Sequence, residues 1–211
     1  MTGKMKTIEL FSGTGSFSKV AKARGHSIFR VEKDTHFEAE VHCDILNLSL
    51  TKEFNDVDIL WASPPCTCFS VASIGSSWWC GSYHPKRTET ALGMAYVLKT
   101  LEIIKKIKPK YWFIENPRGV MRKMAFLQDF HRRTVTYCQY GDNRMKPTDI
   151  WTNFTEWKSR PMCKNGMSCH VSAPRGSKTG TQGLKNARDR SVIPFQLMEE
   201  IIEQIEKVQK L

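Results

Sequence analysis

Short apolar runs alternate with longer stretches of helical periodicity along most of this 211-residue chain. The apolar runs predict strands at residues 6–11, 27–31, 58–62, 111–114, 134–140 and 149–154. Apolar positions spaced by three or four residues predict helices at 16–24, 90–107 and 118–130. Alternating strands and helices predict an α/β fold, in which a mostly parallel sheet carries helices on both faces. Ligands of such sheets bind at the carboxyl ends of the strands.

The pattern changes after the last predicted strand and divides the chain into three regions. Residues 1–154 form the core, whereas residues 155–188 are rich in Gly, Ser, Lys, Arg and Pro and hold few apolar side chains. We expect this second region to fold little on its own and to stand off the sheet as a small basic insert. Residues 189–211 return to the core, packing through a helix at 194–211. The apolar stripe of that helix consists of Leu197, Ile201, Ile205 and Val208.

Composition narrows the class of protein. The length and the hydrophobic content of 40% are sufficient for one domain with an ordinary core. It shows no transmembrane run and no signal peptide, and its seven cysteines are an odd number without disulfide-framework spacing. We therefore expect a cytoplasmic protein with reduced thiols. The net charge of +11 favours a polyanionic partner, although many basic proteins bind no nucleic acid.

A glycine-containing turn follows the first predicted strand. Residues 11–17 (FSGTGSF) open a helix, where glycines permit a tight turn and let a ligand approach the backbone. The third glycine of a dinucleotide fingerprint is absent. Glu32 lies at the end of the next strand, where an acid can accept both ribose hydroxyls, and Asp44 and Ile45 suit an adenine ring. The pattern favours a nucleoside-bearing cofactor without a pyrophosphate; the alternative is an ordinary strand–turn–helix with surface acids.

Two further strand ends carry candidate chemistry. Cys66 follows Pro64 and Pro65, which forbid a helix and fix the backbone of a potential nucleophile. Glu115 follows four apolar residues, so that it sits at the mouth of a strand, where partial burial can keep a carboxyl group protonated. The alternatives are an inert buried cysteine and a solvated loop acid.

The order of these motifs resembles that of the DNA carbon-5 cytosine methyltransferases. The matching motifs are Phe-x-Gly-x-Gly at 11–15, Pro-Pro-Cys at 64–66, Glu-Asn-Pro at 115–117, Tyr-Gly at 140–141 and Ser-Val-x-Pro at 191–194. The resemblance covers residues 6–154 and 189–211. The compact length and the tract at 173–183 are similar to small phage-type members. The resemblance implies a Rossmann-like, S-adenosylmethionine-dependent methyltransferase with a short target-recognition insert.

The resemblance also implies roles for individual residues. The Cys66 thiolate adds to carbon 6 of a flipped-out cytosine, and Glu115 holds or protonates the ring nitrogen while carbon 5 accepts the methyl group. S-adenosylmethionine rests on the glycine turn, with its ribose on Glu32, its adenine on Asp44 and Ile45, and the pocket closed by Pro65, Ser191 and Val192. The residues of the turn that cradle it are Phe11, Gly13, Thr14 and Gly15.

Two regions depart from the family pattern. Family members carry a glutamine followed by two arginines at alternating positions after Tyr-Gly. Here those three positions hold Arg144, Lys146 and Thr148, so that the last arginine is missing. Either Arg144 or Lys146 then supplies the catalytic cation, and Arg118 is another donor candidate. The recognition interval at 155–188 is also much shorter than usual. Because each good base contact contributes about 1–3 kcal/mol of discrimination, we expect a short or degenerate recognition site, or none.

Two secondary features are less specific. Residues 74–87 match the position of the family's mobile loop over DNA, and their Trp78 and Trp79 either fill the gap left by a flipped base or pack into the core. We assign no metal site. Cysteines 163 and 169 with His170 could join Cys138 around zinc, but the spacing matches no common zinc finger and adjacent ligands are awkward.

The interpretation is a monomeric DNA (cytosine-5-)-methyltransferase that acts on duplex DNA in a bacterial host or a phage-infected cell, as in restriction-modification. An RNA (tRNA) cytosine-5 methyltransferase would use the same chemistry. A cytosine amino-methyltransferase would carry an aromatic residue in place of Cys66 and would not need Glu115. A non-catalytic DNA-binding remnant of the fold is the third alternative.

Overall fold

The computed structural model describes residues 3–73, 78–164, 166–172, 184 and 186–210. One sheet organises them, with the strand order β3-β2-β1-β4-β5-β7-β6. Its strands are β1 (Lys6–Leu10), β2 (Ser27–Glu32), β3 (Val41–His42), β4 (Ile59–Ala62), β5 (Tyr111–Pro117), β6 (Arg132–Thr136) and β7 (Pro147–Thr152). Strands β1 to β5 are parallel, and β7 runs antiparallel to both β5 and β6. The predicted mostly parallel sheet is confirmed.

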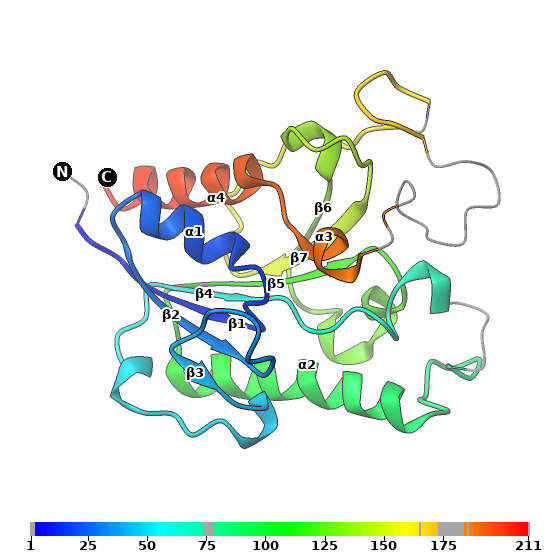
Figure 1. Ribbon diagram of the computed structural model, residues 1–211, viewed down its shortest axis with the longest axis horizontal. Helices are drawn as coiled ribbons and strands as arrows, with labels where there is room; N and C mark the ends of the chain where they lie inside the picture. The colour runs from blue at the N-terminus through cyan, green and yellow to red at the C-terminus, as the bar shows by residue number, and fades with distance from the viewer. Residues whose placement is uncertain (1–2, 74–77, 165, 173–183, 185, 211) are drawn as a thin grey trace.

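Helices cover the two faces of the sheet (Figure 1). The α-helices are α1 (Ser16–Ala23), α2 (Thr88–Ile107), α3 (Ala187–Ser191) and α4 (Phe195–Val208). Trp61 and Phe113 pack under α1 and α4 on one face, while Leu60 and Ile114 join the core that α2 covers on the other face. The alternation follows from the two-residue period of a strand, which sends neighbouring side chains to opposite faces.

The C-terminal helix confirms most of its predicted stripe. Leu197, Ile201 and Ile205 are fully buried in the core shared with α1, whereas Val208 at the last turn is exposed. The stripe therefore ends one turn earlier than the periodicity predicts. None of the helices in the described part of the chain has the length and apolar run needed to span a bilayer.

The predicted helix at 118–130 is wrong. The segment instead forms two short 3-10 turns, η4 (Val120–Lys123) and η5 (Ala125–Leu127). Gly119 is the physical reason, because its backbone pairs with Ser70 and the Val120 N–H donates to the Phe69 carbonyl over 2.7 Å. This pairing takes the chain away from a helical path before the first turn can close.

The predicted strand at 134–140 is half right. Strand β6 ends at Thr136, and η6 (Tyr137–Tyr140) is a 3-10 turn that ends at Gly141 with a φ of 83°. The Tyr137 N–H donates to the Met145 carbonyl across the loop that leads into β7. Three further 3-10 turns are η1 (Ile45–Asn47), η2 (Lys52–Phe54) and η3 (Val71–Ser73). After β7 the chain leaves the sheet, and the tract at 173–183 lies outside the described residues.

Candidate active site

The turn after β1 has the backbone form that its glycines predict. Gly13 and Gly15 adopt left-handed φ values of 46° and 66°, and Phe11 does so at 55°. The Glu32 carboxylate accepts the Gly13 N–H over 2.7 Å, and it also accepts the N–H groups of Lys33 and Asp34. Glu32 is therefore held at the end of β2, where its one carboxylate binds both the turn after β1 and the loop after β2.

A cavity of about 600 Å³ opens at these strand ends. Phe11, Glu32, Asp44, Ile45 and Pro65 all line it, as the sequence predicted for a shared site. The Asp44 carboxylate accepts hydrogen bonds from Lys33 Nζ over 2.8 Å and from the Leu46 N–H over 3.0 Å. The pKa of Asp44 is lowered, chiefly by the hydrogen bond from Lys33. The cavity thus presents the carboxyl groups of Glu32 and Asp44 at two of its walls, and the lowered pKa of Asp44 favours its ionised form.

Tyr96 is a wall of this cavity that the sequence analysis missed. It projects from α2, donates its hydroxyl to Asp44 Oδ2 over 3.1 Å and meets the Phe11 ring edge-on at 5.8 Å between centroids. A lone tyrosine in an amphipathic helix gives no sequence signal for such a role, since only the packing of α2 against the sheet brings it to Asp44.

A second cavity of about 250 Å³ adjoins the first and shares Phe11, Ser63 and Pro65 with it. It holds Cys66, Glu115 and Lys146 together, which joins three residues that are separated by up to 80 positions in the sequence. Asn116 Nδ2 donates to the Pro64 carbonyl over 2.9 Å and so fastens the prolyl loop to β5. This bond places the cysteine beside the carboxyl end of the strand that carries Glu115.

The Cys66 side chain is exposed to this cavity, yet protein atoms surround the sulfur closely enough to change its ionisation. Desolvation raises the pKa of the thiol, while the charge of Lys146 lowers it and the charge of Glu115 raises it. The nucleophile therefore depends on nearby cationic groups for its ionised form.

Glu115 is buried, with 5% of its surface exposed. Burial raises its pKa, against the opposing effects of the Lys146 charge and of a hydrogen bond from the Tyr137 hydroxyl, which lies 3.1 Å from Oε1. A carboxyl group in this setting holds a proton more readily than a solvated one and can donate it to a ring nitrogen.

Lys146 completes the cluster. Its Nζ donates to the Arg190 carbonyl over 2.8 Å and lies 4.8 Å from the centre of the Tyr137 ring. Desolvation lowers the pKa of this ammonium, whereas the charges of Glu115 and Cys66 raise it. Lysine, thiol and carboxyl group thus form one electrostatically connected set.

Arg144 lies outside both cavities and is almost completely buried. Its guanidinium pairs with Asp142 and donates to the main-chain carbonyls of Asp189, Arg190 and Val192. These bonds hold the segment before α4 against the loop before β7. Of the two cations that the sequence proposed, Lys146 is therefore the one that faces Cys66.

The other predicted residues are distributed around these cavities. Thr14 and Ser191 line the second cavity, and Gly15 lines a neighbouring hollow. Val192 lines neither cavity and is 40% exposed, while Ile193 beside it does line the second one. The Ser-Val motif and its neighbour therefore reach the second cavity through Ser191 and Ile193 rather than through Val192.

Glu9 is a further residue that the sequence analysis missed. It is buried in β1, lines the second cavity and accepts the N–H groups of Phe17 and Ser18, which caps α1 from outside the helix. Burial raises its pKa to about 7. An acid at an inward-facing strand position is the signal that the sequence offered.

The two tryptophans near the cysteine differ in burial, although both pack against the core. Trp79 is buried, packs on Phe69 at 5.7 Å between ring centroids and donates Nε1–H to the Cys68 carbonyl over 2.7 Å. Arg87 stacks over the half-buried Trp78 at 5.0 Å. The core alternative is therefore the correct one for Trp79. Residues 74–77 of the predicted mobile loop lie outside the described residues.

Comparison with known proteins identifies the family of the chain. A sequence model of C-5 cytosine-specific DNA methylases matches residues 5–131. A protein of Frog virus 3 (isolate Goorha), named "Probable DNA (cytosine-5)-methyltransferase", is 30% identical over 172 residues, which cover 78% of each chain. The orphan methyltransferase M.SPRI of Bacillus phage SPR is 26% identical over 132 residues, or 56% of this chain and 28% of that protein. The chain belongs to the C-5 cytosine-specific DNA methylase family.

A solved structure supports the same fold. A prophage-encoded DNA modification methyltransferase from E. coli matches with a TM-score of 0.50 at 16% identity, over 71% of this chain and 46% of that one. A DNMT2 variant from Spodoptera frugiperda matches with a TM-score of 0.45 at 18% identity, over 72% and 51%. The chain thus spans about half the length of these two structures. The family resemblance and the Rossmann-like methyltransferase fold predicted from the motifs are confirmed.

Proposed function

We propose that this protein transfers a methyl group from S-adenosylmethionine to carbon 5 of a cytosine in duplex DNA, through a covalent adduct on Cys66. The observation that carries the proposal is the shared cavity of Cys66, Glu115 and Lys146, which adjoins a larger cavity with the features of a nucleoside site. A family likeness alone would not require that the nucleophile, the acid and the cation meet.

The larger cavity fits the proposed cofactor. Glu32 suits the ribose hydroxyls, because its carboxylate is fixed by three N–H groups and still lines the cavity. Asp44 and Ile45 suit the adenine, and the left-handed turn at Gly13 allows close approach to the backbone. Thr14, Gly15, Pro65 and Ser191 complete the binding set that we propose. Bound S-adenosylmethionine supplies an electrophilic methyl group on a sulfonium.

The residues of the second cavity divide the work on the base. The Cys66 thiolate forms a bond to carbon 6 of the cytosine, and the displaced ring electrons make carbon 5 nucleophilic. Glu115, whose pKa is raised by burial, donates a hydrogen bond or a proton to the ring nitrogen where negative charge collects. After carbon 5 has gained the methyl group and lost its proton, the sulfur–carbon bond breaks and the thiolate leaves. Cytosine must leave the base stack to reach this cavity.

Lys146 takes the place that the missing arginine leaves open. Its ammonium lowers the pKa of Cys66 and faces the same cavity as Glu115, so it favours the thiolate before attack. We assign Arg144 a positioning role, because its donors hold the carbonyls of the segment that carries Ser191.

We further propose that residues 1–154 are the catalytic core, that 155–188 are a reduced target-recognition insert and that 189–211 return to the core. The net charge of +11 supports duplex DNA as the partner. A short insert makes few base contacts, so we expect weak sequence discrimination, with each retained contact contributing about 1–3 kcal/mol.

Transfer of labelled methyl groups tests the proposal. Purified protein is incubated with S-adenosylmethionine labelled in the methyl group and with duplex DNA or tRNA, and the product nucleosides are separated. We expect label in 5-methyldeoxycytidine, and none with Cys66→Ala, which retains binding of DNA and cofactor. Label in N4-methyldeoxycytidine, or in tRNA alone, would contradict the proposal.

A further inference from the structure

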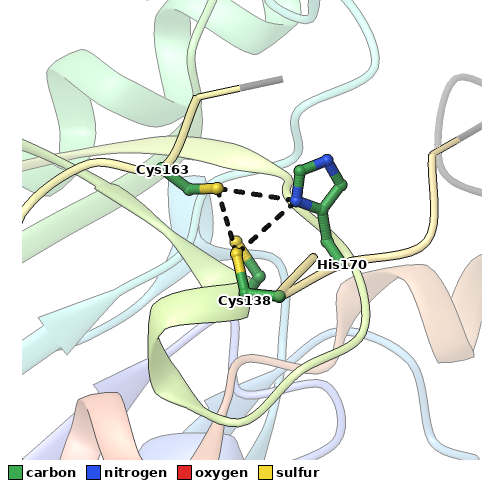
Figure 2. Close-up of side chains that lie close together, drawn as sticks. Cys138, Cys163 and His170 are labelled. Carbon is green, nitrogen blue, oxygen red and sulfur yellow. Dashed lines mark hydrogen bonds between the residues drawn. The ribbon is translucent and has the colours of Figure 1, made fainter. Parts of the chain in front are cut away.

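We propose that Cys138, Cys163, Cys169 and His170 form a zinc site that fastens the first part of the insert to the core. The four side chains offer three sulfurs and one imidazole nitrogen, and these atoms all lie within 4.8 Å of one another. Figure 2 shows the His170 ring turned toward the sulfur atoms. This site lies apart from the two cavities and does not depend on the proposed methyltransferase activity.

The spacing of the ligand atoms suits a tetrahedral ion. The sulfur of Cys163 lies 3.1 Å from that of Cys169 and 3.5 Å from Nδ1 of His170, and the Cys169 sulfur lies 3.7 Å from the same nitrogen. Zinc–sulfur bonds of about 2.3 Å place two sulfurs of a tetrahedron about 3.8 Å apart, so an ion requires only small adjustments. Three cysteines with one histidine are a common structural zinc set, and soft thiolate ligands favour zinc over harder cations.

The arrangement also answers the objection from the sequence. Neighbouring residues make poor ligand pairs when the backbone sends their side chains apart, but here Cys169 and His170 converge on one point. Within the described part of the chain, the His170 ring has no hydrogen-bond partner other than these sulfurs. No competing contact there explains why the imidazole faces the thiols.

The proposed site joins η6 to the segment at 163–170, whose described residues belong to no helix or strand. Cys138 lies in η6, directly after Tyr137, whose hydroxyl contacts Glu115, while the other three ligands lie between residues 163 and 170. Two hydrogen bonds from main-chain N–H groups support the same connection: the Cys163 N–H donates to the Thr136 side-chain Oγ1 over 2.8 Å, and the Val171 N–H donates to the Asn143 carbonyl over 2.9 Å. A bound ion would therefore hold the insert against the turn that supports the acid of the active site.

Metal content and cobalt substitution test the site. The full chain is produced with zinc in the medium, and bound metal is measured by mass spectrometry after extensive dialysis. We expect one zinc per chain, lost in both Cys163→Ser and Cys169→Ser. Cys80→Ser, which removes a cysteine outside the cluster, is the matched control and retains it.

Cobalt gives a second readout that does not rely on the variants folding. Refilling the chelated wild-type protein with Co²⁺ should give the intense visible bands and the sulfur-to-cobalt charge-transfer band of a tetrahedral thiolate site. The refilled protein should also resist proteolysis at 155–172 more than the chelated protein does. Absence of both zinc and these cobalt bands would overturn the proposal. A Cys163–Cys169 disulfide in the protein purified under reducing conditions would do the same.

Discussion

Cys66 lies between groups that act on it in opposite directions. Lys146 lowers the pKa of the thiol and Glu115 raises it, while desolvation has the largest effect and raises it. The same lysine also lowers the pKa of Glu115. A thiolate nucleophile beside a protonated acid is the state that covalent attack on a pyrimidine needs. Lys146 favours the thiolate, whereas burial, against the charge of Lys146, favours the proton on Glu115.

The pH dependence of Cys66 alkylation measures this balance. We expect Lys146→Met to move the midpoint of iodoacetamide labelling to higher pH, because an opposing cation is lost, and Glu115→Gln to move it to lower pH, because a like charge is lost. Peptide mass spectrometry reports Cys66 separately from the other thiols. Cys80 serves as an internal control whose profile stays fixed. Unchanged Cys66 midpoints in both variants would show that neither group acts on the thiol.

The Tyr137 hydroxyl tests the setting of the acid. Tyr137→Phe keeps the ring beside Lys146 but removes the hydrogen bond to buried Glu115. The bond lowers the pKa of Glu115 but also fixes the orientation of its carboxyl group, and we expect the loss of orientation to dominate. One such bond is worth about 0.5–1.5 kcal/mol, so kcat should fall by roughly 2- to 13-fold with little change in the KM for DNA. Steady-state kinetics with an unchanged melting temperature separate this effect from a folding defect. An unaltered kcat would contradict a supporting role for Tyr137.

At the scale of elements, two contacts hold the loop of Cys66 to the end of β5. One is the hydrogen bond from the Asn116 side-chain amide to the Pro64 carbonyl. The other is the close approach of Gly119 to the Phe69–Ser70 backbone. A Cβ atom on Gly119 would lie 2.0 Å from the Phe69 oxygen, a main-chain atom that cannot rotate away. Glycine is therefore required at this position by space rather than by backbone torsion.

Gly119→Ala should accordingly separate the two segments. We expect a loss of about 1–3 kcal/mol in the free energy of unfolding, as for overpacking in a core, together with loss of methyl transfer. Urea denaturation measures the first effect. Gly81→Ala is the control, because a Cβ there meets nothing within 4 Å. Equal stability of the two variants would show that the close approach is not needed.

The sequence predicted the elements that are defined by their own apolar residues. It failed where contacts between residues distant in the sequence determine the path of the backbone. Strands β1, β4 and β5 are mostly buried runs and β2 is a half-buried one, all with clear ends, so they lie close to where the pattern placed them. The helix expected at 118–130 is absent because Gly119 is paired with Ser70, a contact that no local pattern reveals. The strand expected at 134–140 gives way to η6 because Tyr137 bonds across a loop to Met145.

The candidate site follows the same rule. Cys66 and Glu115 could be singled out because their motifs mark strand ends, and parallel strand ends meet at one edge of a sheet. Tyr96 and Tyr137 could not, since each reaches its carboxylate only through the packing of a separate element. The choice between Arg144 and Lys146 likewise required the path of the loop before β7.

At the scale of the whole molecule, the C-terminal helix closes the structure onto its N-terminal elements. Glu206 of α4 accepts bonds from Arg24 Nε and Nη2 and lies 2.9 Å from Nε2 of His26. His26 Nδ1 accepts the Met5 N–H, so Nε2 carries the proton that is donated to Glu206. One carboxylate thereby ties α4 to the end of α1 and the start of β2.

Glu206→Gln tests this closure. The pKa of Glu206 is lowered, mainly by the Arg24 hydrogen bond, so its stabilisation is present above the ordinary glutamate pKa and is lost as pH falls through the folded-state pKa. We expect the variant to be about 1–3 kcal/mol less stable at pH 7, with the difference shrinking toward pH 4 and below. Urea denaturation across this range is the measurement. A difference that is constant with pH would contradict the ionic account.

Covalent attack by Cys66 underlies the proposed methyl transfer, and trapping of the covalent adduct is the decisive experiment. Duplex DNA that contains 5-fluorocytosine is incubated with the protein and S-adenosylmethionine, because fluorine at carbon 5 blocks the final elimination and leaves the enzyme attached. We expect a denaturation-resistant protein–DNA adduct that requires the cofactor and maps to Cys66. An active enzyme that gives no adduct, or an adduct that persists in Cys66→Ala, would contradict it.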